Sequence, residues 1–294
     1  MNEAEFIAAL RTLPLHDGAG ALRDDTARLG DLILTTDTMV EGVHYLATDP
    51  PESVGWKLAA VNLSDLAAKG ARPEGCLLNH ALSGEPGWDA AFLRGLGEAL
   101  ACYAMPLLGG DTVAMPKGAP RSYSLTAIGR AGARVPVRSS ARAGDRLWVT
   151  GTIGDAGAGL AVARGGTGPE RLLARYRRPE PRLAEGLDLA PLVHAMMDVS
   201  DGVLIDALRM AEASALAVEI ALDRLPLAPD YPGSPVEAAT AGDDYELLFA
   251  APDGFVPPVA ATCIGRFDNG TGLRLTSAGS PVMLPDSLGF SHAT

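Results

Sequence analysis

The chain has 294 residues, of which 47% are hydrophobic and 5% aromatic, and its formal net charge is −12. This length is enough for one large domain or two ordinary ones, and Ala, Leu and Val must fill most of the core. The negative charge argues against nucleic acid and anionic membrane surfaces as partners. An anionic substrate stays open if divalent cations stand between it and the protein.

The cysteines and the N-terminal residues indicate the cellular compartment of the protein. Cys76, Cys102 and Cys263 lie far apart and form no CxxC pair, so we expect reduced thiols rather than disulfides or zinc ligands. The first residues are acidic where a signal peptide is basic, and no apolar run reaches the roughly 18 residues of a membrane span. These features together predict a cytoplasmic protein.

The first half of the chain is expected to alternate helices with strands. A loop rich in Gly and Asp, residues 16–26, separates the first helix from the first strand. That strand is β-branched and apolar, and it leads into Asp37. The expected helices are 3–10, 51–69 and 88–103, and the expected strands are 32–36, 76–82, 107–108 and 122–128.

A loop rich in Arg, Ser and Gly begins at Arg138, and we place a domain boundary there. The predicted domains are therefore residues 1–137 and 138–294. The second repeats the alternation, which predicts an α/β or α+β protein with two domains. Its expected elements are strand 146–150, helix 155–163, a strand ending at Asp198, a helix near Asp201, and strands 245–250 and 262–266.

Several aspartates adjoin core-forming segments. Each one alone has an ordinary explanation as a helix N-cap or a turn residue. If they converge, however, their uncompensated charge in one cleft would be prohibitive unless hard divalent cations were present. Carboxylate oxygens are ligands that Mg²⁺ prefers, and Mg²⁺ also binds substrate phosphates. The pattern therefore predicts a phosphate-binding cleft that holds Mg²⁺ on Asp25, Asp37, Asp65, Asp111, Asp198 and Asp201.

The predicted helix over residues 51–69 carries two of its polar side chains on one face. Asn62 and Asp65 are three residues apart, and apolar residues flank them on nearly every side. An exposed polar stripe would also give this spacing. Because unpaired burial is costly, we favour a buried site in which both side chains have partners.

Glycine-rich turns follow two of the expected strands, at residues 109–111 and 151–157, and they suit phosphate binding or simple packing equally well. None of the three lysines follows a glycine, which excludes a Walker A loop. If ATP is used, Arg138 is our candidate for the role of the missing lysine. No Gly-x-Ser-x-Gly elbow is present, and His44 reads either as a substrate contact or as an ordinary loop residue.

Taken in order, these motifs resemble the thiamine-monophosphate kinase family. That family belongs with aminoimidazole ribonucleotide synthetase, selenophosphate synthetase and a hydrogenase-maturation protein. The matching stretches span nearly the whole chain and include Thr-Thr-Asp-Thr-Met-Val-Glu-Gly-Val-His and Val-Asn-Leu-Ser-Asp-Leu-Ala-Ala. They cover residues 24–27, 35–44, 61–68, 109–112, 149–155, 197–202 and 242–247.

The resemblance implies an α+β, two-domain aminoimidazole ribonucleotide synthetase-like fold. The N-terminal domain would form the interface of a homodimer, and the C-terminal domain would be α/β. It implies several Mg²⁺ ions and ATP as co-substrate, with Asp111 and Arg138 in catalytic roles. The implied metal ligands are Asp25, Thr35, Thr36, Asp37, Asp65, Asp111, Asp198 and Asp201; ATP would contact Gly110, Asp111, Arg138 and Ser200, and thiamine monophosphate would contact His44, Asp243 and Phe290.

The implied reaction is direct, in-line transfer of the γ-phosphoryl group of ATP to thiamine monophosphate, which gives thiamine diphosphate. Two departures from the family pattern are Arg23, where glycine is usual, and Asp243, where glutamate is usual. Because of these departures, one alternative stays open: a catalytically silent protein that binds thiamine phosphates or nucleotide. The other alternative is a related enzyme of the same superfamily that acts on another substrate. A selenophosphate synthetase needs a reactive cysteine near the N-terminus. The first cysteine here, Cys76, lies in an expected strand, which argues against that enzyme.

Overall fold

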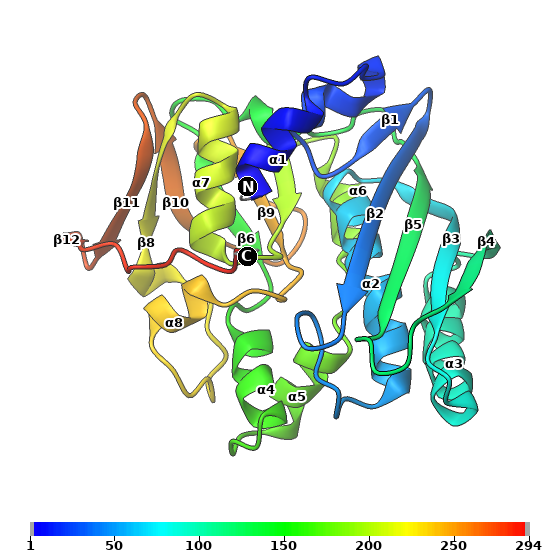
Figure 1. The fold of residues 1–294 in the computed structure, drawn as a ribbon. Coiled ribbons are helices and arrows are strands. Elements are labelled where there is room, and N and C mark those ends of the chain that lie inside the picture. The colour runs from blue at the N-terminus through cyan, green and yellow to red at the C-terminus, as the bar shows by residue number, and fades with distance from the viewer. Residues whose placement is uncertain (1–2, 292–294) are drawn as a thin grey trace.

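A computed structural model describes residues 3–291 of the chain, with side chains from residue 5 onward. It contains two mixed sheets, one from each half of the chain. In Figure 1 the five-stranded sheet stands on the right, and the seven-stranded sheet stands on the left. The alternation of elements predicted an α/β or α+β protein with two domains, and the resemblance implied the α+β class, which is confirmed.

The first sheet has the strand order β1-β2-β5-β3-β4. Its neighbours are antiparallel except for β3 and β4, which run parallel. The strands are β1 (Ala27–Leu29), β2 (Leu32–Val40), β3 (Arg72–Leu82), β4 (Leu107–Ala114) and β5 (Ser122–Arg130).

One face of this sheet is covered and the other is open. Helices α2 (Pro51–Ala68) and α3 (Pro86–Cys102) pack together, and α2 lies against β2 and β5. Tyr123, Leu125 and Ala127, alternate side chains of β5, are fully buried on the helix side. Since side chains alternate across a strand, their neighbours point to the open face.

The second sheet has the strand order β12-β11-β8-β10-β6-β9-β7. Only β8 and β11 run parallel in it. Its core is built from apolar side chains of these strands and of helix α7 (Val203–Ala213). The strands are β6 (Arg146–Thr150), β7 (Ala195–Asp198), β8 (Ala217–Ala221), β9 (Leu247–Ala251), β10 (Ala261–Asp268), β11 (Gly272–Ser277) and β12 (Ser280–Val282).

The other helices lie before the sheets or between their strands. Two 3₁₀ segments matter for the site, because η1 (Asp17–Leu22) precedes the first aspartate pair and η2 (Arg138–Ser140) carries Arg138. The remaining helices are α1 (Glu3–Leu10), α4 (Asp155–Ala163), α5 (Glu170–Arg177), α6 (Leu183–Leu189), η3 (Leu222–Arg224) and α8 (Pro235–Thr240).

Helix α2 is shared by the two halves of the molecule. It contacts β2 and β5 of the first sheet, and also α6 and β7 of the second half. The crossing with α6 is so close that a Cβ atom on Gly186 would lie 2.0 Å from the carbonyl oxygen of Ala67. Gly70, with φ of 56°, continues the same contact against Ala190. Burial of α2 on both sides follows from this position.

Some elements differ from the sequence-based expectation. Asp37 and Asp111 lie inside strands β2 and β4, whereas we expected each to follow the end of a strand. Hydrogen bonding to β5 carries β2 on to Val40. Strands β1, β8, β11 and β12 and helices α5, α6 and α8 were not predicted. Among the described helices, none has the length and apolar character needed to cross a membrane.

Candidate active site

A cavity of about 560 Å³ opens where the two halves of the chain meet. Helix α2 and strand β2 supply one wall, and helix α4 supplies part of another. The turn after β7 and the segment before β9 complete it. The predicted site residues that line it are Asp37, His44, Asp65, Asp198, Ser200, Asp201, Asp243 and Phe290.

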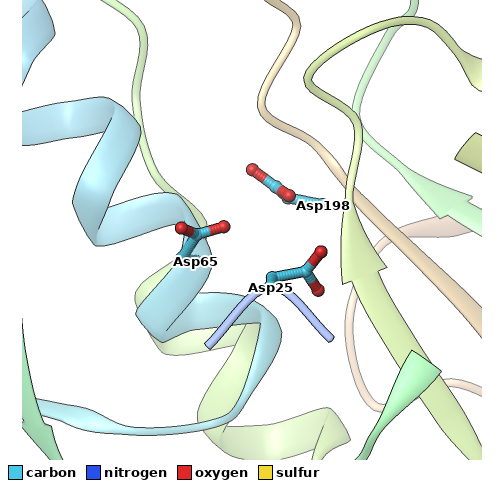
Figure 2. A group of neighbouring side chains, drawn as sticks. All are labelled: Asp25, Asp65 and Asp198. Atoms are coloured by element: carbon cyan, nitrogen blue, oxygen red, sulfur yellow. The ribbon is translucent and has the colours of Figure 1, made fainter. Parts of the chain in front are cut away.

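Three carboxylates from distant parts of the sequence meet beside this cavity. Asp25 comes from the loop before β1, Asp65 from α2, and Asp198 from the end of β7. Figure 2 shows them around one shared space, and one oxygen of each lies within 4.8 Å of the others. A cluster of hard oxygen donors of this kind has the chemistry of a divalent-cation site.

Local contacts hold these carboxylates in place. Ser64, one residue before Asp65 on α2, donates from its hydroxyl to Asp198 Oδ2 at 2.6 Å. The hydroxyl of Thr35 donates to Asp65. Asn62, fully buried on α2, accepts from the backbone N–H of Asp37 at 3.1 Å. The expectation that Asn62 is buried with partners is therefore met.

Among the residues that the structure describes, cationic side chains contact only Asp25 of the three carboxylates. The ammonium of Lys69 lies 2.9 Å from Asp25 Oδ2, and the guanidinium of Arg138 contacts Asp25 Oδ1. Burial alone would raise the pKa of Asp25, but the two cations outweigh it and hold that pKa below its usual value.

The pKa values of the neighbouring aspartates are raised instead of lowered. Burial, together with the neighbouring carboxylates, raises the pKa of Asp198 to about 8 and that of Asp37 to about 6. The same causes, burial first, hold the pKa of Asp65 well above its usual value. Without a cation, this cluster therefore retains protons that isolated aspartates would release.

The free energy of unfolding of the metal-free protein should fall as pH rises from about 5 to about 8. Unfolded aspartates ionise near pH 3.8, whereas the folded protein keeps protons on Asp37 up to about pH 6 and on Asp198 up to about pH 8. The folded state binds more protons in this window, so each rise in pH favours unfolding.

Denaturant titrations in the presence of a chelator, at several pH values across this window, measure the effect. An Asp198→Asn variant should show a shallower fall, since its side chain no longer titrates. A wild-type stability that stays level or rises over the window would contradict this reading of the cluster.

The substrate-side residues lie along the cavity. His44 Nδ1 accepts from the backbone N–H of Val40 at 3.0 Å. The backbone N–H of Phe290 donates to the carbonyl of Asp201 at 2.9 Å, which attaches the C-terminal segment next to the acidic turn. The Asp201 carboxylate contacts Arg209 of α7.

Two predicted site residues, Thr36 and Asp111, lie on the other face of the first sheet. Thr36 donates to the carbonyl of Leu125 and accepts from the hydroxyl of Thr126, away from α2. Gly110 and Asp111 sit in the exposed edge strand β4. Asp111 pairs with Asn79, which belongs to the row of Ser124 and Thr38.

That row belongs to the open face, because the residues beside it in the strands, Leu125 and Leu78, are buried against the helices. The row spans four adjacent strands, and three inter-strand spacings of about 4.8 Å place Asp111 about 14 Å from Thr38. One chain therefore does not bring Asp111 to the Asp25, Asp65 and Asp198 cluster.

Two lysines also belong to the site. The sequence analysis used them only to exclude a Walker A loop. Lys57, on α2, donates to Asp243 Oδ2 at 2.6 Å and to the carbonyl of His44 at 3.1 Å. Lys69 contacts Asp25 as described above. Lys57 lies in α2 and Lys69 directly follows it, and the acidic motifs elsewhere in the chain were the signal that could have identified their partners.

Comparison with known proteins covers most of the chain. Residues 17–131 match the family model of the AIR synthase related protein N-terminal domain, and residues 142–273 match its C-terminal domain. The thiamine-monophosphate kinase of Caulobacter vibrioides is 40% identical over 92% of this chain and 84% of its own length. The Escherichia coli enzyme of the same name is 35% identical over 89% of this chain and 86% of its own.

The chain belongs to the thiamine-monophosphate kinase family.

Solved structures agree with membership in the thiamine-monophosphate kinase family. AaThiL complexed with AMPPCP and TMP has a TM-score of 0.88 and 30% identity, covering 99% of this chain and 97% of its own. Thiamine-monophosphate kinase of Stenotrophomonas maltophilia has a TM-score of 0.77 and 34% identity, covering 95% and 96%. The hydrogenase maturation protein HypE of Escherichia coli, at 21% identity and a TM-score of 0.73 over 92% of each chain, shares the fold alone.

Proposed function

We propose that this chain is a thiamine-monophosphate kinase, which transfers the γ-phosphoryl group of ATP to thiamine monophosphate and forms thiamine diphosphate. Family membership and the likeness to AaThiL complexed with AMPPCP and TMP support the proposal. The observation that carries it is the convergence of Asp25, Asp65 and Asp198 at the edge of one cavity. A kinase needs cations there, since two phosphates otherwise repel each other.

Mg²⁺ is the cation that this donor set suits best. Hard oxygen ligands fit it, and the raised pKa values of Asp65 and Asp198, caused by burial and neighbouring carboxylates, indicate that negative charge in the cluster is unfavourable without a cation. We assign it to Asp25, Thr35, Asp37, Asp65, Asp198 and Asp201. Thr36 and Asp111 lie on the open face of a sheet, and we assign them to the metal site only across the homodimer proposed below. When bound, divalent cations neutralise and orient the phosphates of both substrates.

The chain's own groups then complete the site. An oxygen of the thiamine monophosphate phosphate attacks the γ-phosphorus, and the bond to the β–γ bridging oxygen breaks to release ADP. The attacking oxygen is already ionised, so a general base is not needed. Arg138, with Gly110, Asp111 and Ser200, is assigned to ATP. The Nε of Arg138 is buried without a hydrogen-bond partner among the described residues, which leaves a donor for a phosphate oxygen.

The thiamine end of the substrate is assigned to His44, Asp243 and Phe290, which line the same cavity. Asp243 is held between Lys57 and the hydroxyl of Tyr245, which donates to its Oδ1 at 3.0 Å. This support positions the carboxylate although it is one methylene shorter than the usual glutamate. Phe290 is 43% exposed and offers an aromatic face for stacking.

The structure argues against a selenophosphate-synthesising enzyme and gives little support to a catalytically silent binding protein. Cys76 is fully buried in β3, and burial raises the pKa of its thiol to about 11, so it is not the reactive cysteine of a selenophosphate-synthesising enzyme. Arg23 has φ of −115°, a conformation that does not require the usual glycine, and its side chain is exposed. This departure therefore gives a catalytically silent protein no structural support.

A homodimer across the open face of the first sheet is part of the proposal. That face carries Thr36 and Asp111, and the neighbouring strands expose large apolar side chains that a partner would cover. These are Leu77, Leu107, Leu108 and Val113. Domains 1–137 and 138–294 are also proposed, supported by the gap between β5, which ends at Arg130, and β6, which begins at Arg146. A cytoplasmic location follows from the composition argument.

Formation of thiamine diphosphate from ATP and thiamine monophosphate tests the proposal. We expect product with Mg²⁺ and none in excess chelator, with ADP formed in equal amount. Thiamine should not replace thiamine monophosphate as acceptor, because it lacks the ionised phosphate oxygen that attacks. A purified, folded protein that binds both substrates and forms no product would instead identify the silent binding protein.

A further inference from the structure

Lys69 is a fully buried lysine at the edge of the acidic cluster. It is the C-cap residue of α2, directly after Ala68, and its side chain has no exposed surface. Its ammonium contacts Asp24 Oδ1 at 2.6 Å, Asp25 Oδ2 at 2.9 Å and the carbonyl oxygen of Met196 at 3.3 Å. A lysine at a helix end is normally solvated, where it interacts with the helix dipole from the surface.

These three contacts can pair all the N–H donors of the Lys69 ammonium. An ammonium has three N–H donors and no acceptor, and Lys69 has three acceptors within hydrogen-bond distance. A buried ammonium is tolerated only with such pairing. The arrangement is therefore a built binding site for a positive charge, with the charge supplied by the chain itself.

The same contacts join three segments that carry the cluster. Asp24 and Asp25 lie in the loop between η1 and β1, Lys69 ends α2, and Met196 lies on β7, two residues before Asp198. Lys69 thus holds the loop of Asp25 against the two elements that position Asp65 and Asp198.

Arg138 also contacts Asp25, but its situation differs. Its side chain is 21% exposed, against 0% for Lys69, and it carries an unpartnered Nε. It belongs to η2 on the connection between the sheets. Arg138 can therefore turn toward a phosphate when one arrives, while Lys69 has no space to leave.

We infer that Lys69 is a permanent counter-charge of the cluster, which fixes Asp24 and Asp25 and does part of the neutralisation that a divalent cation would otherwise supply. This inference rests on the proposed binding of Mg²⁺ at the cluster. Lys69 is a positioning residue here, since it acts through Asp25 and not on a substrate.

A Lys69→Met variant tests the inference, because methionine keeps most of the length of the side chain without its charge. The melting temperature is measured in excess chelator and in saturating Mg²⁺, without nucleotide. In chelator we expect a fall of about 5–10 °C relative to wild type, since the partly buried carboxylates of Asp24 and Asp25 then have only Arg138, within the described part of the chain, as a nearby cation. Mg²⁺ should remove more than half of that fall, because the cation replaces the missing charge.

Two further variants separate charge from packing. Lys57→Met removes an equally buried lysine that pairs with Asp243, outside the cluster, so its loss should be the same with and without Mg²⁺. Adding Asp24→Asn to Lys69→Met removes one of the stranded carboxylates, and it should restore part of the stability in chelator.

The outcomes are distinguishable. A Lys69→Met loss that Mg²⁺ reduces, together with a Lys57→Met loss that it does not, supports the inference. Equal losses of Lys69→Met in chelator and in Mg²⁺ would assign Lys69 to packing alone and overturn it. A wild-type protein whose melting temperature does not respond to Mg²⁺ would overturn the proposed metal site itself.

Discussion

An Asp65→Asn variant is expected to lose at least about a hundredfold in kcat while the metal-free protein keeps or gains stability. Asp65 lies at the centre of the acidic cluster, and asparagine removes a charge that the proposed cations need during transfer. In the metal-free protein the same charge is unfavourable, since burial and the neighbouring carboxylates hold the pKa of Asp65 well above its usual value. Function and stability should therefore move in opposite directions.

Steady-state kinetics at saturating Mg²⁺, with thermal unfolding in chelator, measure both effects. Asp31→Asn is a suitable control: this carboxylate is 68% exposed and pairs with Arg130 at the surface, so neither quantity should change noticeably. Near-normal turnover in Asp65→Asn would remove Asp65 from the proposed metal site. A large loss of stability in chelator would show that the carboxylate mainly supports the fold.

Asp111→Asn is expected to lower kcat by a similar factor without changing the stability of the isolated chain. Asp111 lies in an exposed edge strand, on the face of the sheet turned away from the cluster. If it acts in catalysis, the proposed homodimer must bring it to the cluster of the other subunit. The effect on activity then depends on which subunit carries the substitution.

Mixed dimers make this dependence measurable. When an Asp65→Asn chain and an Asp111→Asn chain are co-expressed with different affinity tags, the mixed dimer contains one site with both defects and one with neither. We expect it to have about half of the wild-type activity, although both parent variants are inactive. An inactive mixed dimer would show that Asp111 acts within its own chain, and failure to isolate one would contradict the dimer.

Much of the site was predictable because its aspartates are attached to recognisable elements. Asp65 interrupts an apolar helix, and Asp198 ends a strand just before a helix begins. Both features predict a carboxylate directed toward a shared interior space and not toward solvent. The structure brings these two together with Asp25, as the sequence pattern suggested.

The face on which Asp111 lies was not predictable from the same signals. Residues 107–114 show no alternation of polar and apolar side chains, and two consecutive glycines give no indication of direction. Only the pairing of β4 with β3 fixes the face, and that pairing joins segments separated by helix α3. The register of a parallel pair depends on packing across this distance.

Lys69 was missed for a different reason. At the end of a predicted helix, just before a glycine, a lysine fits the pattern of an ordinary solvated C-terminus. Its burial depends on β7 and on the 24–25 loop, both of which reach it from distant parts of the chain. The residues next to Lys69 in the sequence therefore do not indicate that its side chain is buried.

The crossing of α2 and α6 has a consequence for how the family can vary. Backbone meets backbone there, at Gly186 and Ala67, and a single added carbon would collide. Grafting the second half of one family member onto the first half of another would therefore succeed only if both parents keep small residues at this joint.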